Sequence, residues 1–355
     1  MSGRTEVLIV KIGAIGDVVM ALPMAVAARE LDDDVRVTWV CGTAVEPLLR
    51  AADVADELMM VDDRALWAGG VRERIRAVSS LWRRLALRRL DLVAIGHPDA
   101  RYRLLALPVR GRVTRRWDRA QSRAWPIWGR YHGDENVRLI LGGDGATRQR
   151  RPLPEVRFPL LEELATELGD SHLGRVVLVP GAAKNLIRDD ALRRWPIERY
   201  AELAQRLVAD GRQVVLAGSS SDAWVREAFA GTSVVDLVGR TDLVQLCGVM
   251  QRSDLVVTHD SGPMHLALLA RVPLVALFGP TVPYEKIIPG DDVAVLWGGD
   301  DLACRPCYDG NGYADCPLNV CLRELTVEHV FRQAQRLLEA RSSGEAAPVA
   351  ADGGG

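Results

Sequence analysis

Two glycines and an aspartate follow the first apolar run of the chain, in the sequence K-I-G-A-I-G-D-V-V from Lys11 to Val19. The glycines allow the backbone to turn tightly and to approach a ligand closely. Asp17 then falls in the first turn of the next helix, where the helix dipole favours a carboxylate. That carboxylate either caps its helix or serves as a general base for a bound hydroxyl group. The spacing of this loop alone favours the cap.

The same loop departs from two common nucleotide-binding motifs. Its G-x-x-G lacks the first glycine pair of the dinucleotide fingerprint, and no acidic residue closes the second strand. The G-K-[ST] of a P-loop is also missing. The sequence therefore disfavours a dehydrogenase and excludes a P-loop.

Two loops in the second half of the chain also carry groups that suit a nucleotide. In V-P-G-A-A-K followed by R-R-W-P, small residues expose backbone N–H groups, and Lys184 and Arg193 could meet phosphate oxygens. The loop G-S-S-S-D ends in Asp222, which either accepts ribose hydroxyls or caps the helix that follows.

The stretch H-D-S-G-P-M-H-L-A, from His259 to Ala267, is the most informative of the chain. It presents several N–H donors and the Ser261 hydroxyl toward an anion at a helix start. His265 either reaches the same ligand or is a buried histidine on an apolar face. The cluster as a whole is hard to explain by packing, because each residue weakens the strand or helix it interrupts. The next strand closes with F-G-P-T, ending at Thr281, which would line the same site.

Alternating strand-like and helix-like runs must position these loops. In the first half the predicted strands are 6–11, 35–40, 57–61 and 90–95, and the predicted helices are 17–30 and the arginine-rich 71–88. Residues 112–159 break the rhythm and are predicted to form loops, short helices and the passage between domains. In the second half the predicted strands are 175–179, 213–217, 234–237, 255–259 and 274–278, with helices 197–209, 222–230, 243–251 and 264–270. Repeated strand and helix predict parallel sheets covered on both faces.

The pattern predicts two Rossmann-like α/β domains, 1–165 and 170–325, then a helix over 326–341 capped by Thr326 and a disordered tail, 342–355. Ligands of open α/β sheets bind at the carboxyl ends of the strands. Two such sheets facing each other would surround one cleft, which suits a reaction between two bound molecules.

Composition limits the class of partner. The 355 residues are 48% hydrophobic and 26% charged, with a formal net charge of −2, so no global basic field would attract nucleic acid. Two arginine-rich stretches, 72–89 and 101–119, form either a solvated helix face with loops or a surface that meets an anionic acceptor or lipid. No run approaches the about 20 apolar residues of a membrane span, and the N-terminus does not read as a signal peptide. The sequence therefore predicts a cytoplasmic protein.

Four of the six cysteines, Cys304, Cys307, Cys316 and Cys321, gather in one Gly/Asp/Pro-rich loop. C-x2-C is a good metal half-site, so four thiolates could hold a structural zinc or iron. Reduced surface thiols and a disulfide pair are the alternatives. Cys41 and Cys247 are predicted to be core residues.

Taken together, the order and spacing of K-I-G-A-I-G-D-V-V, V-P-G-A with R-R-W-P, H-D-S-G-P-M-H-L-A and L-F-G-P-T resemble glycosyltransferase family nine, the ADP-heptose heptosyltransferases of lipopolysaccharide core assembly. The resemblance runs from Val7 to about Glu339. It implies a GT-B fold, an inverting mechanism and no catalytic metal or other required cofactor.

The resemblance also implies roles for individual residues. Asp17 would be the general base, with Gly13 and Gly16 of its loop on the acceptor side. Arg101 and Arg103, after the fourth strand, are further acceptor candidates, because family acceptors carry acidic sugars and phosphates. The donor would be held by Gly181, Ala182, Lys184, Arg193, Asp222, Asp260, Ser261, Gly262, Met264 and His265. The family's ribose-binding glutamate is missing near Ser221, so Asp222 would have to replace it.

The predicted reaction is transfer of a heptose or related sugar from ADP-heptose to a lipopolysaccharide core or similar glycan, which could be lipid-linked and bring the protein to the inner face of the membrane. A different nucleotide-sugar glycosyltransferase, an epimerase on the same fold, a protein-directed heptosyltransferase and a non-catalytic glycan-binding or scaffold protein are the alternatives.

Overall fold

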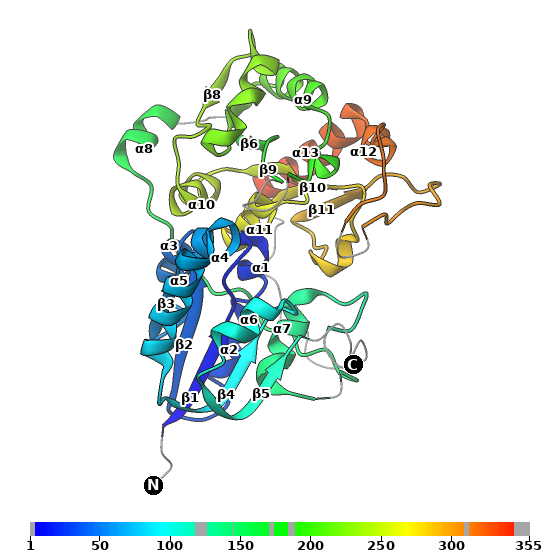
Figure 1. The fold of residues 1–355 in the computed structure, drawn as a ribbon. Helices are drawn as coiled ribbons and strands as arrows, with labels where there is room; N and C mark the ends of the chain where they lie inside the picture. The colour runs from blue at the N-terminus through cyan, green and yellow to red at the C-terminus, as the bar shows by residue number, and fades with distance from the viewer. Residues whose placement is uncertain are drawn as a thin grey trace. The chain divides into compact units, whose positions relative to one another are not determined.

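The computed structural model describes residues 4–117, 126–143, 145–169, 174–183, 189–308 and 312–343. Its helices and strands form two compact units (Figure 1). Of the described residues, the first unit comprises those up to Arg157 together with Asp189 and the short segment Tyr284–Ile287, and the second comprises Phe158–Ala183, Asp190–Pro283 and those from Ile288. The predicted tail falls outside the described residues from position 344 onward.

The first unit contains a five-stranded parallel sheet in the order β3-β2-β1-β4-β5. Its central strand, β1, is the apolar run at the N-terminus, and Val7 to Val10 are fully buried there. Because both faces of a central parallel strand are covered, an uninterrupted apolar run is the expected sequence. The strands are β1 (Thr5–Val10), β2 (Val35–Gly42), β3 (Glu57–Val61), β4 (Arg89–Ile95) and β5 (Arg110–Arg116).

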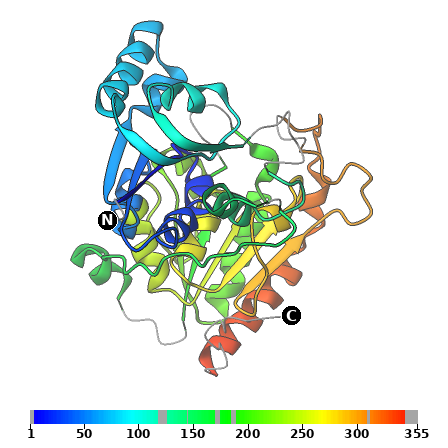
Figure 2. The same ribbon diagram turned by 90° about the horizontal axis from the view of Figure 1, so that it is seen from below.

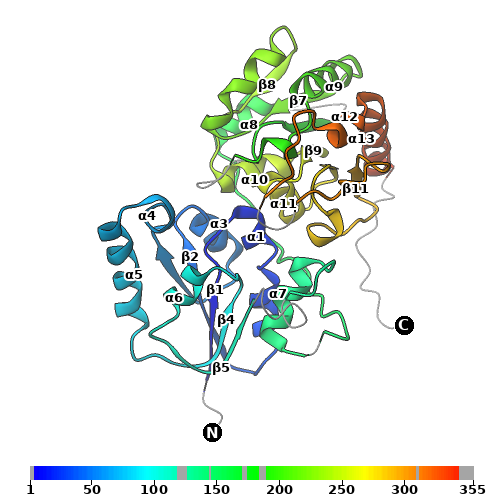
Figure 3. The same ribbon diagram turned by 45° about the vertical axis from the view of Figure 1, so that its right-hand side comes forward.

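Helices cover both faces of this sheet. One face packs against α4 (Asp63–Ala68), α5 (Val71–Leu85) and α6 (Ala100–Leu105) in a shared apolar core. The other packs against α2 (Pro23–Ala28) and α7 (His132–Leu141), as Figure 2 and Figure 3 show. Two short helices, α1 (Ile15–Val19) and α3 (Glu46–Ala52), follow β1 and β2.

The second unit contains a six-stranded parallel sheet in the order β11-β10-β9-β6-β7-β8. Its strands are β6 (Arg175–Val179), β7 (Gln213–Leu216), β8 (Val234–Asp236), β9 (Leu255–His259), β10 (Leu274–Phe278) and β11 (Val293–Trp297). The helices are α8 (Glu162–Leu168), α9 (Ile197–Ala209), α10 (Leu243–Gln251), α11 (Gly262–Leu269), α12 (Val320–Glu324) and α13 (Val327–Ser342), with short 3-10 turns η2 (Ala191–Arg193), η3 (Ser220–Phe229) and η4 (Pro283–Glu285).

Most predicted elements are confirmed, including the N-cap of the last helix, where the Thr326 hydroxyl accepts a hydrogen bond from the His329 amide. The buried cores contain Cys41 and Cys247, also as predicted. No helix in the described ranges is long and apolar enough to cross a bilayer.

Three predictions about the elements were wrong. The helix predicted over 17–30 is two helices, because Pro23 starts α2 and has no N–H to continue the hydrogen-bond ladder of α1. Residues 112–159, predicted to form loops, short helices and the passage between domains, contain most of the strand β5. The strand β11 was also missed.

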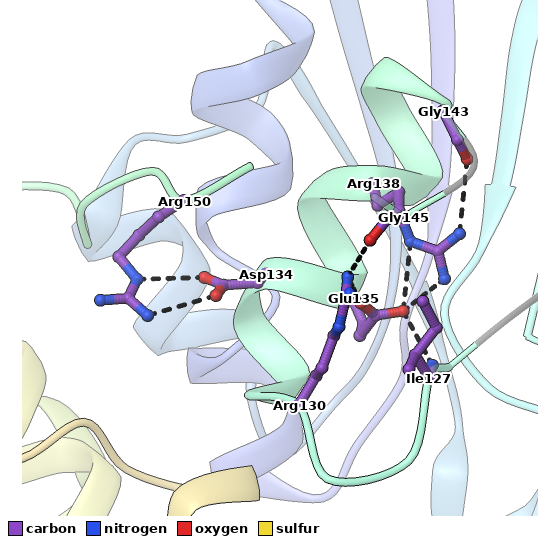
Figure 4. A network of polar contacts seen from close by, with 8 residues as sticks. All are labelled: Ile127, Arg130, Asp134, Glu135, Arg138, Gly143, Gly145 and Arg150. Atoms are coloured by element: carbon purple, nitrogen blue, oxygen red, sulfur yellow. Dashed lines mark hydrogen bonds and ion pairs between the residues drawn. The ribbon is translucent and has the colours of Figure 1, made fainter. Parts of the chain in front are cut away.

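The helix α7 (His132–Leu141) lies in this stretch, and its bounds were not predicted because its buried positions are polar. Asp134, Glu135, Asn136 and Arg138 are all buried, which reverses the usual amphipathic pattern. Figure 4 shows how the charges are matched. The Glu135 carboxylate accepts hydrogen bonds from the Ile127 amide at 3.0 Å and from the Arg138 guanidinium, while Asp134 accepts from Arg150 at 3.2 and 3.3 Å. This network fixes the start of α7, where His132 lies.

We expect Glu135→Gln to destabilise the protein by about 3 kcal/mol, because it leaves the Arg138 guanidinium buried without its counter-charge. Urea unfolding followed by circular dichroism measures the loss. Glu162→Gln, at an exposed position of α8, is the control and should cost under about 0.5 kcal/mol. Equal losses in the two variants would contradict the role given to this network.

Candidate functional site

Asp17 lies in α1, the short helix that follows the central strand β1. Ala14 is the N-cap of α1, and the Asp17 side chain makes no capping hydrogen bond, so the structure gives no support to the capping alternative. The Asp17 side chain is 34% exposed, and its Oδ2 lies 3.8 Å from the ammonium nitrogen of Lys11. A Cβ added to Gly13 would meet no atom within 4 Å, so this loop borders open space that a ligand could occupy.

Lys11 is a fully buried charge of the first unit. Its residue is 1% exposed, and its ammonium donates a hydrogen bond to the Gly96 carbonyl at 2.7 Å. The Trp117 ring lies 5.4 Å from the same nitrogen. Burial lowers the pKa of Lys11, and the nearby Asp17 carboxylate opposes that shift.

Further basic groups surround Asp17. Burial by itself would raise the pKa of Asp17, but the charges of Lys11, Lys286, His97 and His132 outweigh it and hold this pKa well below its usual range. The Lys286 ammonium donates to His132 Nδ1 at 3.1 Å, and the His132 ring meets Trp117 edge to face at 5.2 Å. Asp17 is therefore a carboxylate held in its ionised form.

The acceptor-side arginines lie on α6. Arg101 makes a bidentate pair with Asp99 at 2.8 and 3.0 Å and stacks on Trp67 at 3.6 Å, so its guanidinium is held in one orientation. Arg103 is exposed. The hydroxyl of Tyr102, between them, donates to the Gly13 carbonyl at 2.9 Å and ties α6 to the Asp17 loop. Contact of Arg101, Arg103, Gly13 or Gly16 with an acceptor stays a prediction.

In the second unit, the loop after β6 is held from two sides. The Ala182 amide donates to Asp222 Oδ1 at 3.0 Å, and its carbonyl accepts from Nε and Nη2 of Arg194 at 3.0 and 2.9 Å. Ala182 and Ala183 both have φ of 54°, a left-handed conformation that L-residues adopt at a cost. A Cβ on Gly181 would lie 2.5 Å from Asp222 Cγ, so only glycine fits there. Lys184 lies outside the described residues.

Asp222 is buried and already engaged. Its Oδ2 accepts hydrogen bonds from the Ser219 amide at 2.8 Å and the Ser219 hydroxyl at 2.7 Å, while Oδ1 holds Ala182. Both oxygens therefore brace the loops that follow β6 and β7. Its contact with a ribose stays a prediction, and the carboxylate would have to serve it beside these bonds.

Arg193 joins the ends of β9 and β10 to the loop after β6. Its Nη2 donates to Asp190 Oδ2 at 2.7 Å, and its Nη1 lies 3.5 Å from Asp260 Oδ2, which also accepts from the Thr281 hydroxyl at 2.7 Å. Burial alone would lower the pKa of Arg193, but Asp260, Tyr313 and Asp190 raise it above its ordinary value. A permanent cation therefore lies among buried carboxylates at the strand ends.

The H-D-S-G-P-M-H stretch ends β9 and starts α11. Ser261 is the N-cap of α11 and donates its hydroxyl to the His259 carbonyl at 3.0 Å. Burial, with help from Arg193 and Arg194, lowers the pKa of His259 to about 3, so this ring stays neutral beside Tyr200, 3.1 Å away. The side chains of Met264 and His265 are buried, which leaves backbone groups of this turn, beginning at Gly262, to meet a ligand. The donor roles of these residues stay predictions.

The four late cysteines border one cavity of about 140 Å³ beneath Gly279 and Pro280. No group of three or more potential ligands is arranged to hold a metal ion in the described ranges, so the predicted zinc or iron lacks support. Burial raises the pKa of the Cys321 thiol to about 11 and also raises that of Cys307. The Cys307 and Tyr308 amides both donate to the Pro280 carbonyl, so this loop packs directly on the F-G-P-T turn.

Four residues that lie near the Asp17 cluster or the Arg193 cluster were not identified as site residues from the sequence. They are Trp117, His132, Lys286 and Tyr313. One signal could have found Lys286. The chain has only three lysines among 45 basic residues, and two of them, Lys11 and Lys184, were already in predicted site loops. The others are ordinary in sequence, and only the fold brings them to the site.

Comparison with known proteins shows which family and which solved structures the chain is similar to. Residues 161–311 match the family described as "Glycosyltransferase family 9 (heptosyltransferase)". A lipooligosaccharide heptosyltransferase 2 of Campylobacter jejuni is 30% identical over 155 residues, 41% of this chain and 47% of that protein, so this match spans about half of the relative. A lipopolysaccharide heptosyltransferase 1 of Pseudomonas aeruginosa is 28% identical over 318 residues, covering 85% of this chain and 86% of that protein.

An Escherichia coli heptosyltransferase solved with ADP-2-deoxy-2-fluoro heptose has a similar fold, with a TM-score of 0.68 and 17% identity over 93% of this chain and 99% of that one. The resemblance to glycosyltransferase family nine is confirmed by these matches. The predicted fold class, an α/β GT-B fold with two Rossmann-like units, is confirmed as well.

The charge of Asp17 should appear in the acid stability of the protein. Because the pKa of Asp17 lies below the unfolded value of about 3.9, its carboxylate stabilises the fold above that pH and loses this contribution as the pH falls toward the folded pKa. We expect the stability difference between the wild type and Asp17→Asn to shrink between pH 5 and about pH 2 in urea titrations. Asp33→Asn, at an exposed position, is the control, and a difference for Asp17→Asn that does not change with pH would contradict the assigned environment.

Proposed function

We propose that this protein transfers a heptose or a related sugar from ADP-heptose to a lipopolysaccharide core or similar glycan, with inversion at the anomeric carbon. The observation that carries the proposal is the Arg193 cluster at the strand ends of the unit whose residues 161–311 match the family. The E. coli protein of similar fold was solved with an ADP-sugar analogue, which supports the same class of donor here.

In the proposed reaction, the Asp17 carboxylate takes the proton of an acceptor hydroxyl as that oxygen attacks the anomeric carbon. The bond from this carbon to the diphosphate breaks on the opposite face, and its electron pair leaves with ADP. General-base help of this kind contributes roughly 10²–10⁴ in rate. The step requires that the Asp17 carboxylate and the donor's anomeric carbon meet in the reacting complex.

Stabilising the departing diphosphate is the larger demand. Arg193 is already paired with two carboxylates. Its guanidinium is therefore charged and oriented, but only part of its hydrogen-bonding capacity is left for a diphosphate. Backbone N–H groups at the start of α11 would supply the rest, together with the positive end of the helix dipole. Loss of one such donor typically costs about 10²–10³ in turnover.

Release of ADP from ADP-heptose in the presence of a core acceptor tests the proposal. We expect Asp17→Asn to lower kcat by roughly 10²–10⁴, with the affinity for ADP retained, because the substitution removes the base and leaves the donor groups in place. Near-normal turnover in Asp17→Asn, with its fold verified by circular dichroism, would show that the base is another group.

A nucleotide panel in thermal shift tests the donor side separately. We expect ADP to protect the wild type more than UDP or GDP, and Arg193→Lys to weaken ADP binding about tenfold, because a lysine cannot reproduce the forked contacts of a guanidinium. Arg212→Lys is a matched control, since both arginine side chains are 19% exposed and paired with an aspartate. Stronger protection by UDP or GDP would favour another glycosyltransferase or an epimerase, and no protection by any nucleotide would favour a non-catalytic protein.

The cytoplasmic location, a protein acceptor and a contact with the membrane face remain predictions from the sequence. The exposed arginines of α5 are compatible with an anionic acceptor or lipid, and no contact in the structure distinguishes the two.

A further inference from the structure

The segment Tyr284–Ile287 brings a cation to the Asp17 cluster from far along the chain. It belongs to the first unit, and two contacts of Glu285 hold it there. The Gly129 amide donates to Glu285 Oε1 at 2.8 Å, and Glu285 Oε2 lies 3.9 Å from His132 Nε2. Lys286, the next residue, meets the other side of the same ring at Nδ1, 3.1 Å away. His132 is thus fixed between a carboxylate and an ammonium.

The Lys286 ammonium has hydrogen-bond donors that the described residues do not engage. An ammonium has three N–H donors. Among the described residues the Lys286 ammonium makes one hydrogen bond, to His132, and no carboxylate oxygen lies within 4.0 Å of its nitrogen. The other lysine of the cluster differs in this respect. Lys11 is committed to the Gly96 carbonyl and to Asp17 and is closed off from solvent, whereas Lys286 is half-buried.

Lys286 is therefore a cation of the Asp17 cluster whose N–H donors are not all used. Lys11 balances Asp17, and Glu285 is engaged with the Gly129 amide and His132. The Trp117 ring, against both His132 and Lys11, keeps this side of the cluster poorly hydrated, which strengthens any ionic contact formed there. A half-buried ammonium in such surroundings is suited to a carboxylate or a phosphate oxygen.

We propose that Lys286, positioned by His132, forms an anion subsite beside Asp17, filled by a carboxylate or phosphate group of the acceptor, and that the bound anion makes Asp17 a stronger base. This inference rests on the proposed function. It assigns the anionic group of the acceptor to residues other than Arg101 and Arg103.

A carboxylate surrounded by cations is stable when ionised and therefore accepts a proton reluctantly. An anion on Lys286 cancels part of the positive field at Asp17, so the proton of the acceptor hydroxyl is taken more readily once that acceptor is bound. The anionic acceptor would then both orient itself and activate the base, while a neutral acceptor would meet a weaker one.

Paired acceptors test this inference. The probes are a core acceptor with a terminal acidic sugar and the same glycan with its carboxylates converted to methyl esters. We expect the wild type to prefer the anionic acceptor by about 10- to 100-fold in kcat/KM, the size of one charge-assisted contact. In Lys286→Met the ratio of the two kcat/KM values should fall toward one, and Lys286→Arg should keep most of it.

Inorganic phosphate gives a second measurement that needs no anionic glycan. It should inhibit the wild type competitively with the neutral acceptor and should lose at least tenfold in potency against Lys286→Met. A ratio near one in the wild type, or a preference unchanged in Lys286→Met, would overturn the subsite. Failure of the proposed function is distinct, because the wild type would then release no ADP with either acceptor, while ADP protection in thermal shift reports on the donor site alone.

Discussion

A buried positive charge at the end of the central strand organises the first unit. An unpaired ammonium in an apolar interior costs several kcal/mol, so Lys11 requires both the Gly96 carbonyl and the Asp17 carboxylate. This requirement directs the Asp17 side chain toward the end of the sheet and keeps it ionised. The ionised state of Asp17 and the stability of the core are therefore connected through one contact.

In the second unit the charges are arranged in the opposite way, with one cation among several carboxylates. There a single arginine, Arg193, lies among the carboxylates of Asp190 and Asp260, and Asp222 spends both oxygens on the neighbouring loops. These bonds hold Ala182 in a left-handed conformation and set the shape of the loop after β6. A diphosphate would meet a rigid site whose cation is shared, which gives the backbone amides at the start of α11 a large part in binding it.

Local patterns were sufficient where burial and polarity follow simple rules. The apolar strands β1, β6, β9 and β10 were readable because central parallel strands are covered on both faces, and the polar residues that interrupt the chain after them marked the site loops. The bounds of helix α7 could not be predicted in this way, because its buried face is charged. Arg138 of the same helix pairs with Glu135, and Arg150 of a later segment pairs with Asp134. Propensity and periodicity contain no term for such pairing.

The sequence by itself determined the two α/β units, the strand-end loops and the candidacy of Asp17 and Arg193. Only the tertiary structure decided that Lys286 and His132 belong beside Asp17 and that the Asp222 carboxylate is occupied by loop amides. The physical reason is range. Turn chemistry and hydrophobic periodicity act over a few residues, whereas the partners of a buried charge are chosen by packing between segments that are distant along the chain.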